Sequence, residues 1–174
     1  ATRIYDPVTN TFIAGPALTA AAYSGAHSIQ RPDGKFLIVH AGGVTTTSVY
    51  DPVSNTMSVG PALTAAASNG AHSIQRPDGK FLIVLGNATT NTSIYDPVTN
   101  TASAGPALTA TASSGAHSIQ RPDGKFLTLL ASGVTATSIY DPGWAVTGYY
   151  ESEALNIAQL NQSSLLRYNT NSEG

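Results

Sequence analysis

The sequence predicts an all-β protein made of four-stranded antiparallel sheets that repeat about every 45 residues. Three observations support this fold class. Each repeat carries short apolar or β-branched runs separated by turns that contain Gly, Pro, Asn or Asp, which is the pattern of short strands. The tripeptide Tyr-Asp-Pro recurs every 45 residues, at Tyr5, Tyr50, Tyr95 and Tyr140. A longer segment, GAHSIQRPDGKFL, recurs without substitution at Gly25, Gly70 and Gly115.

The first complete unit begins with two predicted strands. We expect the first strand over residues 26–30. It ends at a turn in which Pro32 fixes φ, Asp33 can accept a hydrogen bond from the nearby backbone, and Gly34 supplies a positive φ. The second strand is expected over residues 36–40. Because its apolar residues are consecutive, both of its faces must be buried.

Two further strands complete the unit. Residues 41–43, rich in glycine, end the second strand, and the β-branched run 46–50 predicts the third. The Asp-Pro turn 51–55 leads to a fourth strand over residues 56–59. The alanine-rich stretch 17–22 would permit a short helical turn, but its flanking Gly and Pro residues favour a loop that crosses between sheets.

A single sheet of this kind cannot cover its own apolar residues, because residues 36–39 are apolar on both faces. Neighbouring copies must cover them, and radial stacking of four-stranded blades in a β-propeller does so while leaving only short edges. We therefore predict tandem propeller repeats over residues 1–142, forming about 3 to 3.5 blades of an incomplete ring. Residues 143–174 break the period and are expected to end the last blade, with a strand over 144–149, and to begin a further β segment.

The repeat resembles that of the kelch family. Tyr5-Asp6-Pro7 is followed by Asn10-Thr11 and by the aromatic Phe12 at the position where that family carries Trp. The Asp-Gly-Lys turn, the apolar strand after it and the pair Gly42-Gly43 are also similar. Later copies depart from the pattern: Met57 and Ala102 replace the aromatic residue, and Asn87-Ala88 and Ser132-Gly133 replace the glycine pair.

The resemblance extends to galactose oxidase-like propellers of bacterial surface proteins. It implies a ring of four to eight blades that serves as an interaction platform. The chain would then be a fragment of a longer protein or a homo-oligomer whose copies complete the ring. Its first residue is Ala1, within a repeat, and no signal peptide is visible, so we expect a processed chain or a fragment.

The composition excludes several functions. Charged residues make up 10% of the chain and the net charge is −2, so nothing directs it to nucleic acid or to an anionic membrane. The chain has no cysteine, which excludes disulfides and thiolate chemistry. Its apolar runs are far shorter than the roughly 20 residues of a membrane helix. The many Thr, Ser and Asn residues favour an extracellular or cell-surface location.

The repeated histidines are the first candidates for chemistry. His27, His72 and His117 fall on the strand expected to lie nearest the central channel, where imidazoles could bind zinc or copper. Duplication of a structural residue explains their recurrence equally well, and three neighbouring blades of a large ring would not converge. A copper–radical oxidase of the galactose oxidase type requires a Tyr cross-linked to Cys, which this chain lacks. We predict no cofactor and no metal.

The carboxylates are expected to form turns rather than to act as acids or bases. We therefore predict no catalytic residue and assign a structural role to the residues that define the repeat. These are Tyr5, Asp6, Pro7, His27, Asp33 and Gly34, followed by Tyr50, Asp51, His72, Asp78, Gly79, Tyr95, Asp96, His117, Asp123, Gly124, Tyr140 and Asp141.

The sequence favours a non-catalytic extracellular module. Turns with charged residues gather at one end of every blade, and nearly uncharged, hydroxyl-rich loops gather at the other, where a protein or a glycan could bind. Asn87, Asn91 and Asn161 also fit the glycosylation pattern. Two alternatives remain: a purely structural repeat that assembles with further copies of itself, and a fragment of a kelch-type oxidase or lyase with its active site elsewhere.

Overall fold

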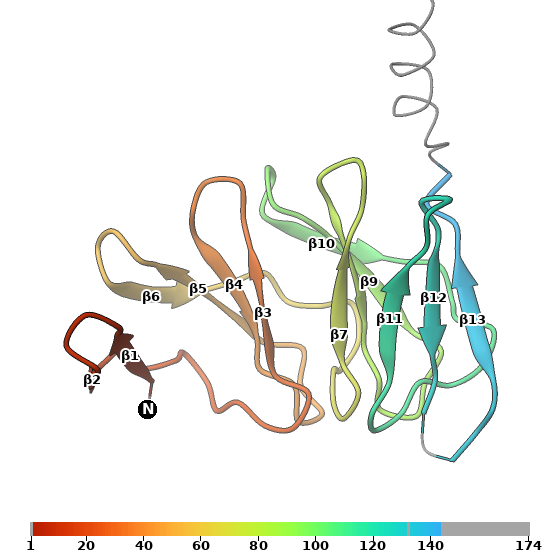
Figure 1. Ribbon diagram of the computed structural model, residues 1–174, viewed down its shortest axis with the longest axis horizontal. Helices are drawn as coiled ribbons and strands as arrows, with labels where there is room; N and C mark the ends of the chain where they lie inside the picture. Colours follow the sequence, from red (N-terminus) through yellow and green to blue (C-terminus); the bar gives the residue numbers. More distant parts are fainter. Residues whose placement is uncertain (1, 132, 144–174) are drawn as a thin grey trace, which may run out of the picture.

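The computed structural model describes residues 2–131 and 133–143, which form four antiparallel sheets (Figure 1). No helix occurs among these residues, so the all-β prediction is confirmed. The predicted strand over residues 144–149 and the further β segment lie outside the described residues.

Three sheets follow the 45-residue repeat and are called the first, second and third blade. The first blade contains β3 (His27–Gln30), β4 (Phe36–Val39), β5 (Thr47–Asp51) and β6 (Thr56–Val59). The second contains β7 (His72–Gln75), β8 (Phe81–Val84), β9 (Thr92–Asp96) and β10 (Thr101–Ala104). The third contains β11 (His117–Gln120), β12 (Phe126–Leu129) and β13 (Thr137–Tyr140). A half-blade, equivalent to the outer two strands of a blade, contains β1 (Arg3–Asp6) and β2 (Thr11–Ala14).

The turns form as the sequence predicts. In the outer turn of the first blade, the backbone N–H of Val53 donates to Asp51 Oδ1 over 2.9 Å, and Asn55 adopts a φ of 53°. In the inner turn, the N–H of Lys35 donates to Asp33 Oδ1 over 3.1 Å. These local bonds fix the strand register, in which Tyr50 lies opposite Met57 and Phe36 lies opposite Tyr50.

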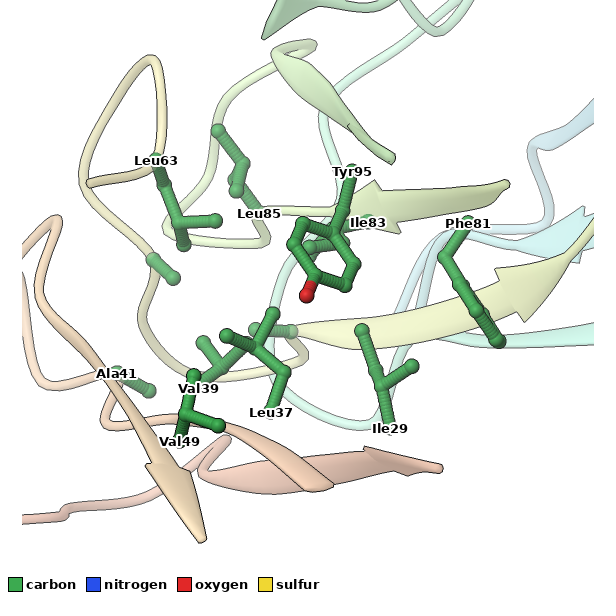
Figure 2. Packing of buried hydrophobic residues seen from close by; sticks show 12 residues of the cluster. Ile29, Leu37, Val39, Ala41, Val49, Leu63, Phe81, Ile83, Leu85 and Tyr95 are labelled. Atoms are coloured by element: carbon green, nitrogen blue, oxygen red, sulfur yellow. The ribbon is translucent and has the colours of Figure 1, made fainter. Parts of the chain in front are cut away.

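The blades stack face to face. Each blade has a forward face, which packs on the next blade in sequence, and a rear face, which packs on the previous one. The forward face of the first blade contributes Ile29, Leu37, Val39 and Val49 to a buried cluster. The rear face of the second blade contributes Phe81, Ile83, Leu85 and Tyr95 to the same cluster (Figure 2). The predicted burial of the second strand on both sides is found in full at β8, whereas Phe36 and Ile38 on the rear face of β4 are only partly buried.

Crossing loops tie each blade to the next. In the loop between the first and second blades, the N–H of Leu63 donates to Thr45 O and that of Ala67 donates to Val44 O. The same loop reaches the next blade through Thr64, whose Oγ1 lies 2.5 Å from Ser93 Oγ. The equivalent stretch 17–22 holds no helix, which agrees with the loop interpretation.

The blades succeed one another in a row that does not close into a ring (Figure 1). The inner strands β3, β7 and β11 are neighbours along this row. One end of the row is the half-blade and the other is the third blade, so each described end presents a sheet face with no further sheet on it.

Candidate functional site

The repeated histidines lie on the inner strands, as predicted. Nδ1 of His72 lies 2.9 Å from the backbone carbonyl oxygen of Gly70. Since a carbonyl can only accept, Nδ1 carries the proton and Nε2 of the neutral ring is the acceptor. Nε2 lies 2.8 Å from Oγ of Ser118 on the next blade, which donates to it. His72 therefore links two inner strands and uses both ring nitrogens.

This arrangement does not fit a metal centre. The rings of His72 and His117 lie 6.1 Å apart between centroids, but both nitrogens of His72 are engaged. Within residues 2–131 and 133–143, no three His, Cys, Asp or Glu side chains are grouped closely enough to hold a metal ion. Burial lowers the pKa of His72, as do the positive charges that His27 and His117 would carry, and burial also lowers the pKa of His27. The neutral form that hydrogen-bonds to the blade is therefore favoured.

Charged side chains pair at the opposite edge of each blade from the crossing loops. Lys35 Nζ lies 3.2 Å from Asp51 Oδ2, and the repeat-equivalent pairs Lys80–Asp96 and Lys125–Asp141 lie 3.1 and 2.9 Å apart. The pKa of Asp51 is lowered by the hydrogen bond from the Ser54 N–H and by Lys35. These carboxylates stay ionised and hold turns, a state unsuited to a general acid at neutral pH.

An arginine at the same edge reaches into the following blade, a contact that sequence reasoning missed. Arg31 donates from Nη1 to Asn100 Oδ1 over 2.8 Å and from Nη2 to Pro97 O over 3.2 Å. Tyr95 OH donates to the same Asn100 Oδ1 over 3.0 Å. We call the arginine the hook, and we call the outer turn of the next blade, with its Tyr, Asn and Pro carbonyl, the socket. One unit later, Cζ of Arg76 lies 6.0 Å from the ring centroid of Tyr140.

The crossing loops form a surface almost without charge. An open hollow of about 530 Å³ is lined by Ala17, Leu18 and residues 20–22, and the neighbouring Tyr23 is exposed. Asn87 and Asn91 are also exposed on this side of the second blade. Apolar and hydroxyl groups at such a surface suit hydrogen bonding and stacking with a neutral ligand.

His40 forms a buried network that sequence reasoning missed. Its Nδ1 lies 2.9 Å from Thr46 Oγ1 and its Nε2 lies 2.7 Å from Ser48 Oγ. Burial lowers the pKa of His40 below its ordinary value of 6.5. The equivalent residues of the other two blades are Leu85 and Leu130, both fully buried. A single His at an otherwise apolar repeat position gave no pattern by which it could be recognised.

His40 is expected to make stability depend on pH. Because its folded pKa lies below its unfolded pKa, the unfolded chain binds more protons as pH falls below about 6.5. Stability that is fully present above that pH is therefore lost as pH falls toward the folded pKa. His40→Leu, which copies the residue of the other blades, is expected to flatten the profile measured by urea unfolding at successive pH values. His117→Gln, at an exposed position, is the control. An unchanged profile in His40→Leu would contradict this account.

Comparisons with known proteins bear on the fold alone. No family model matches the sequence, and no curated protein matches it. Among solved structures, the fold is similar to that of a novel fungal alcohol oxidase with catalytic diversity among the AA5 family, in complex with copper. The TM-score is 0.53 at 19% sequence identity, over 72% of this chain and 29% of the oxidase. The chain thus spans less than a third of that protein and shares with it a fold of repeated four-stranded antiparallel sheets arranged as propeller-like blades.

Proposed function

We propose that this chain is a non-catalytic extracellular module, a propeller scaffold that binds protein or glycan or assembles with copies of itself. One observation supports this above all: the repeated polar side chains bond to their own or the adjacent blade. The hook of Arg31, the ion pair of Lys35 and the link of His72 each do so. A catalytic site needs side chains that differ from blade to blade and converge on a substrate, whereas these residue types recur at one repeat position, and the Lys35 ion pair itself recurs as Lys80–Asp96 and Lys125–Asp141.

The uncharged crossing loops are the proposed recognition surface. Their small residues and hydroxyl groups suit a neutral partner such as a glycan or an uncharged protein surface. No helix in the described ranges is long and apolar enough to cross a membrane. The composition rich in Thr, Ser and Asn and the kelch-like repeat are compatible with propellers of the bacterial surface type, and we place the module at the cell exterior on that basis.

The alternative is a fragment of a kelch-type oxidase or lyase. It is favoured by the fold similarity to a copper-containing alcohol oxidase. The described residues do not fit a copper centre, because His72 has no free ring nitrogen and no suitable group of three ligands occurs in the described part. An active site would therefore require residues from another part of a longer protein.

A paired assay separates these functions. The chain is expected to bind neutral glycans on an array, and to produce no hydrogen peroxide from primary alcohols after incubation with copper. Catalase-sensitive peroxide formation above a heat-denatured control would contradict the non-catalytic proposal. Binding to no glycan, together with concentration-dependent assembly, would favour the purely structural form of the module.

A further inference from the structure

The forward face of the third blade leaves apolar side chains exposed that its predecessors bury. Ile119 is 50% exposed, whereas the equivalent Ile29 is 2% exposed. Ile139 is 52% exposed, whereas the equivalent Val49 is 7% exposed. In the first blade this face is covered by the rear face of the second blade. The outer-strand part of this cover is Tyr95 on β9, whose counterpart in the half-blade is Tyr5, whereas the inner-strand part on β8 has no counterpart in the half-blade.

The hook on this face is also exposed. The side chain of Arg31, inserted in the socket of the second blade, is 10% exposed, whereas that of Arg121 is 43% exposed. Arg121 Nη2 lies 2.9 Å from Asp123 Oδ2, just as Arg31 Nη2 lies 3.0 Å from Asp33 Oδ2. Arg121 thus makes the same internal ion pair that Arg31 makes beside its socket.

A matching socket stands at the other end of the row, on the half-blade. Tyr5 OH donates to Asn10 Oδ1 over 3.0 Å, the same bond that Tyr95 makes to Asn100. Asn10 has a φ of 55° and Asn100 a φ of 54°, so the two turns share one conformation. Yet Tyr5 is 49% exposed and Tyr95 is 0% exposed. The socket of the half-blade is formed without an arginine in it.

We propose that the forward face of the third blade in one copy of this chain binds the half-blade of a second copy. Arg121 of one copy would donate to Asn10 Oδ1 and Pro7 O of the other, as Arg31 does to Asn100 and Pro97. The inference rests on the self-assembly form of the proposed function. Because the two surfaces differ, the contact is head to tail, and repetition extends it into a filament or closes it into a ring.

A second copy is favoured over an unrelated partner because hook and socket both belong to this chain. Their pairing already occurs within it, between the first and second blades, over 2.8 and 3.2 Å. The exposed Ile119 and Ile139 lie on the forward face of the third blade. Their equivalents in the first blade, Ile29 and Val49, belong to the buried cluster that contains Tyr95. The ring of Tyr5 is available to take the place that Tyr95 holds.

Sedimentation velocity over a wide concentration range tests the contact. The unmodified chain is expected to associate with increasing concentration. Asn10→Gly keeps the positive-φ turn but removes the acceptor, and Arg121→Ala removes the hook. Each is expected to weaken association by about tenfold or more, because each removes a hydrogen bond to a charged group. Asn55→Gly makes the same change in the turn of the first blade and is expected to leave association unchanged.

A mixture of the two variants tests the head-to-tail geometry. Asn10→Gly retains its hook and Arg121→Ala retains its socket, so the mixture is expected to form heterodimers that grow no further. Failure of the mixture to associate would overturn the proposal, as would a monomeric unmodified chain at all concentrations or a loss of association in Asn55→Gly.

These outcomes remain separate from the proposed function as a whole. A monomeric chain that still binds glycans would overturn self-assembly and leave the recognition module standing. Peroxide formation by the copper-treated chain would overturn the non-catalytic function, whatever the state of association.

Discussion

Replacement of Tyr95 by alanine is expected to lower the free energy of unfolding by about 3–5 kcal/mol, the range for truncating a buried aromatic side chain. Tyr95 is fully buried between the first two blades, in the cluster with Leu37 and Ile83. Its ring lies 6.5 Å from that of Phe81, and its hydroxyl completes the socket for Arg31. Alanine would leave a cavity in the cluster between the first and second blades and would remove the tyrosine of the socket. Urea unfolding followed by circular dichroism measures the loss.

Tyr5→Ala is the matched control, because Tyr5 occupies the same repeat position in the half-blade. Its ring packs on Phe12 at 5.1 Å but is half exposed, so the expected loss is about 0.5–1.5 kcal/mol, the range of one aromatic pair. The comparison is made at low concentration, where self-association contributes nothing. Equal losses in the two variants would show that blade stacking does not bury the repeated tyrosine.

Gly70→Ala is the second large effect, with an expected loss of about 2–5 kcal/mol from left-handed strain and steric overlap combined. Gly70 has a φ of 82°, and a Cβ built on it would overlap the backbone carbonyl of Ser113 in the next crossing loop. The backbone at Ser113 cannot move aside as a flexible side chain can, so the second and third blades would have to separate. Thermal unfolding of the variant gives the size of the effect.

Gly79→Ala isolates the strain from the overlap. Gly79 has a φ of 79°, almost that of Gly70, but a Cβ there would meet nothing within 4 Å. The expected loss is about 1–2 kcal/mol, the cost of the left-handed conformation alone. If Gly79→Ala were as damaging as Gly70→Ala, close approach of the blades at Gly70 would not be the cause.

The local structure was predictable from the sequence because short-range chemistry determines it. The Asp33 turn and the Asp51 turn follow from residues within each turn, and the consecutive apolar residues of the second strand required burial on both sides, which β8 shows in full. These features depend on residues close together in the chain, so the sequence of each repeat is sufficient to predict its own turns and strands. The loop assignment of residues 17–22 follows in the same way from the flanking Gly and Pro residues.

Contacts between blades were not predictable, because their partners lie far apart in sequence. Arg31 looked like a turn residue, and only the stacking of the blades shows that it bonds to Asn100, 69 residues later. The link from His72 to Ser118 likewise depends on the spacing of inner strands. From the sequence alone, His27, His72 and His117 were possible metal ligands. Only the structure shows that both ring nitrogens of His72 are hydrogen-bonded, to Gly70 and to Ser118.

One set of links between the crossing loops and the blades recurs at a fixed separation along the chain. Thr19, Thr64 and Thr109 each bond to the serine 29 residues ahead, at Ser48, Ser93 and Ser138. Each of these hydrogen bonds depends on the separation of 29 residues between the Thr and the Ser, and not on which repeat contains them. Gain or loss of a whole number of 45-residue units therefore keeps this Thr–Ser pairing at the new junction, whereas an insertion of a partial unit between the two residues changes their separation. Unequal recombination can then change the length of this protein in steps of one unit, because the residues already present form the Thr–Ser bonds at the new junction.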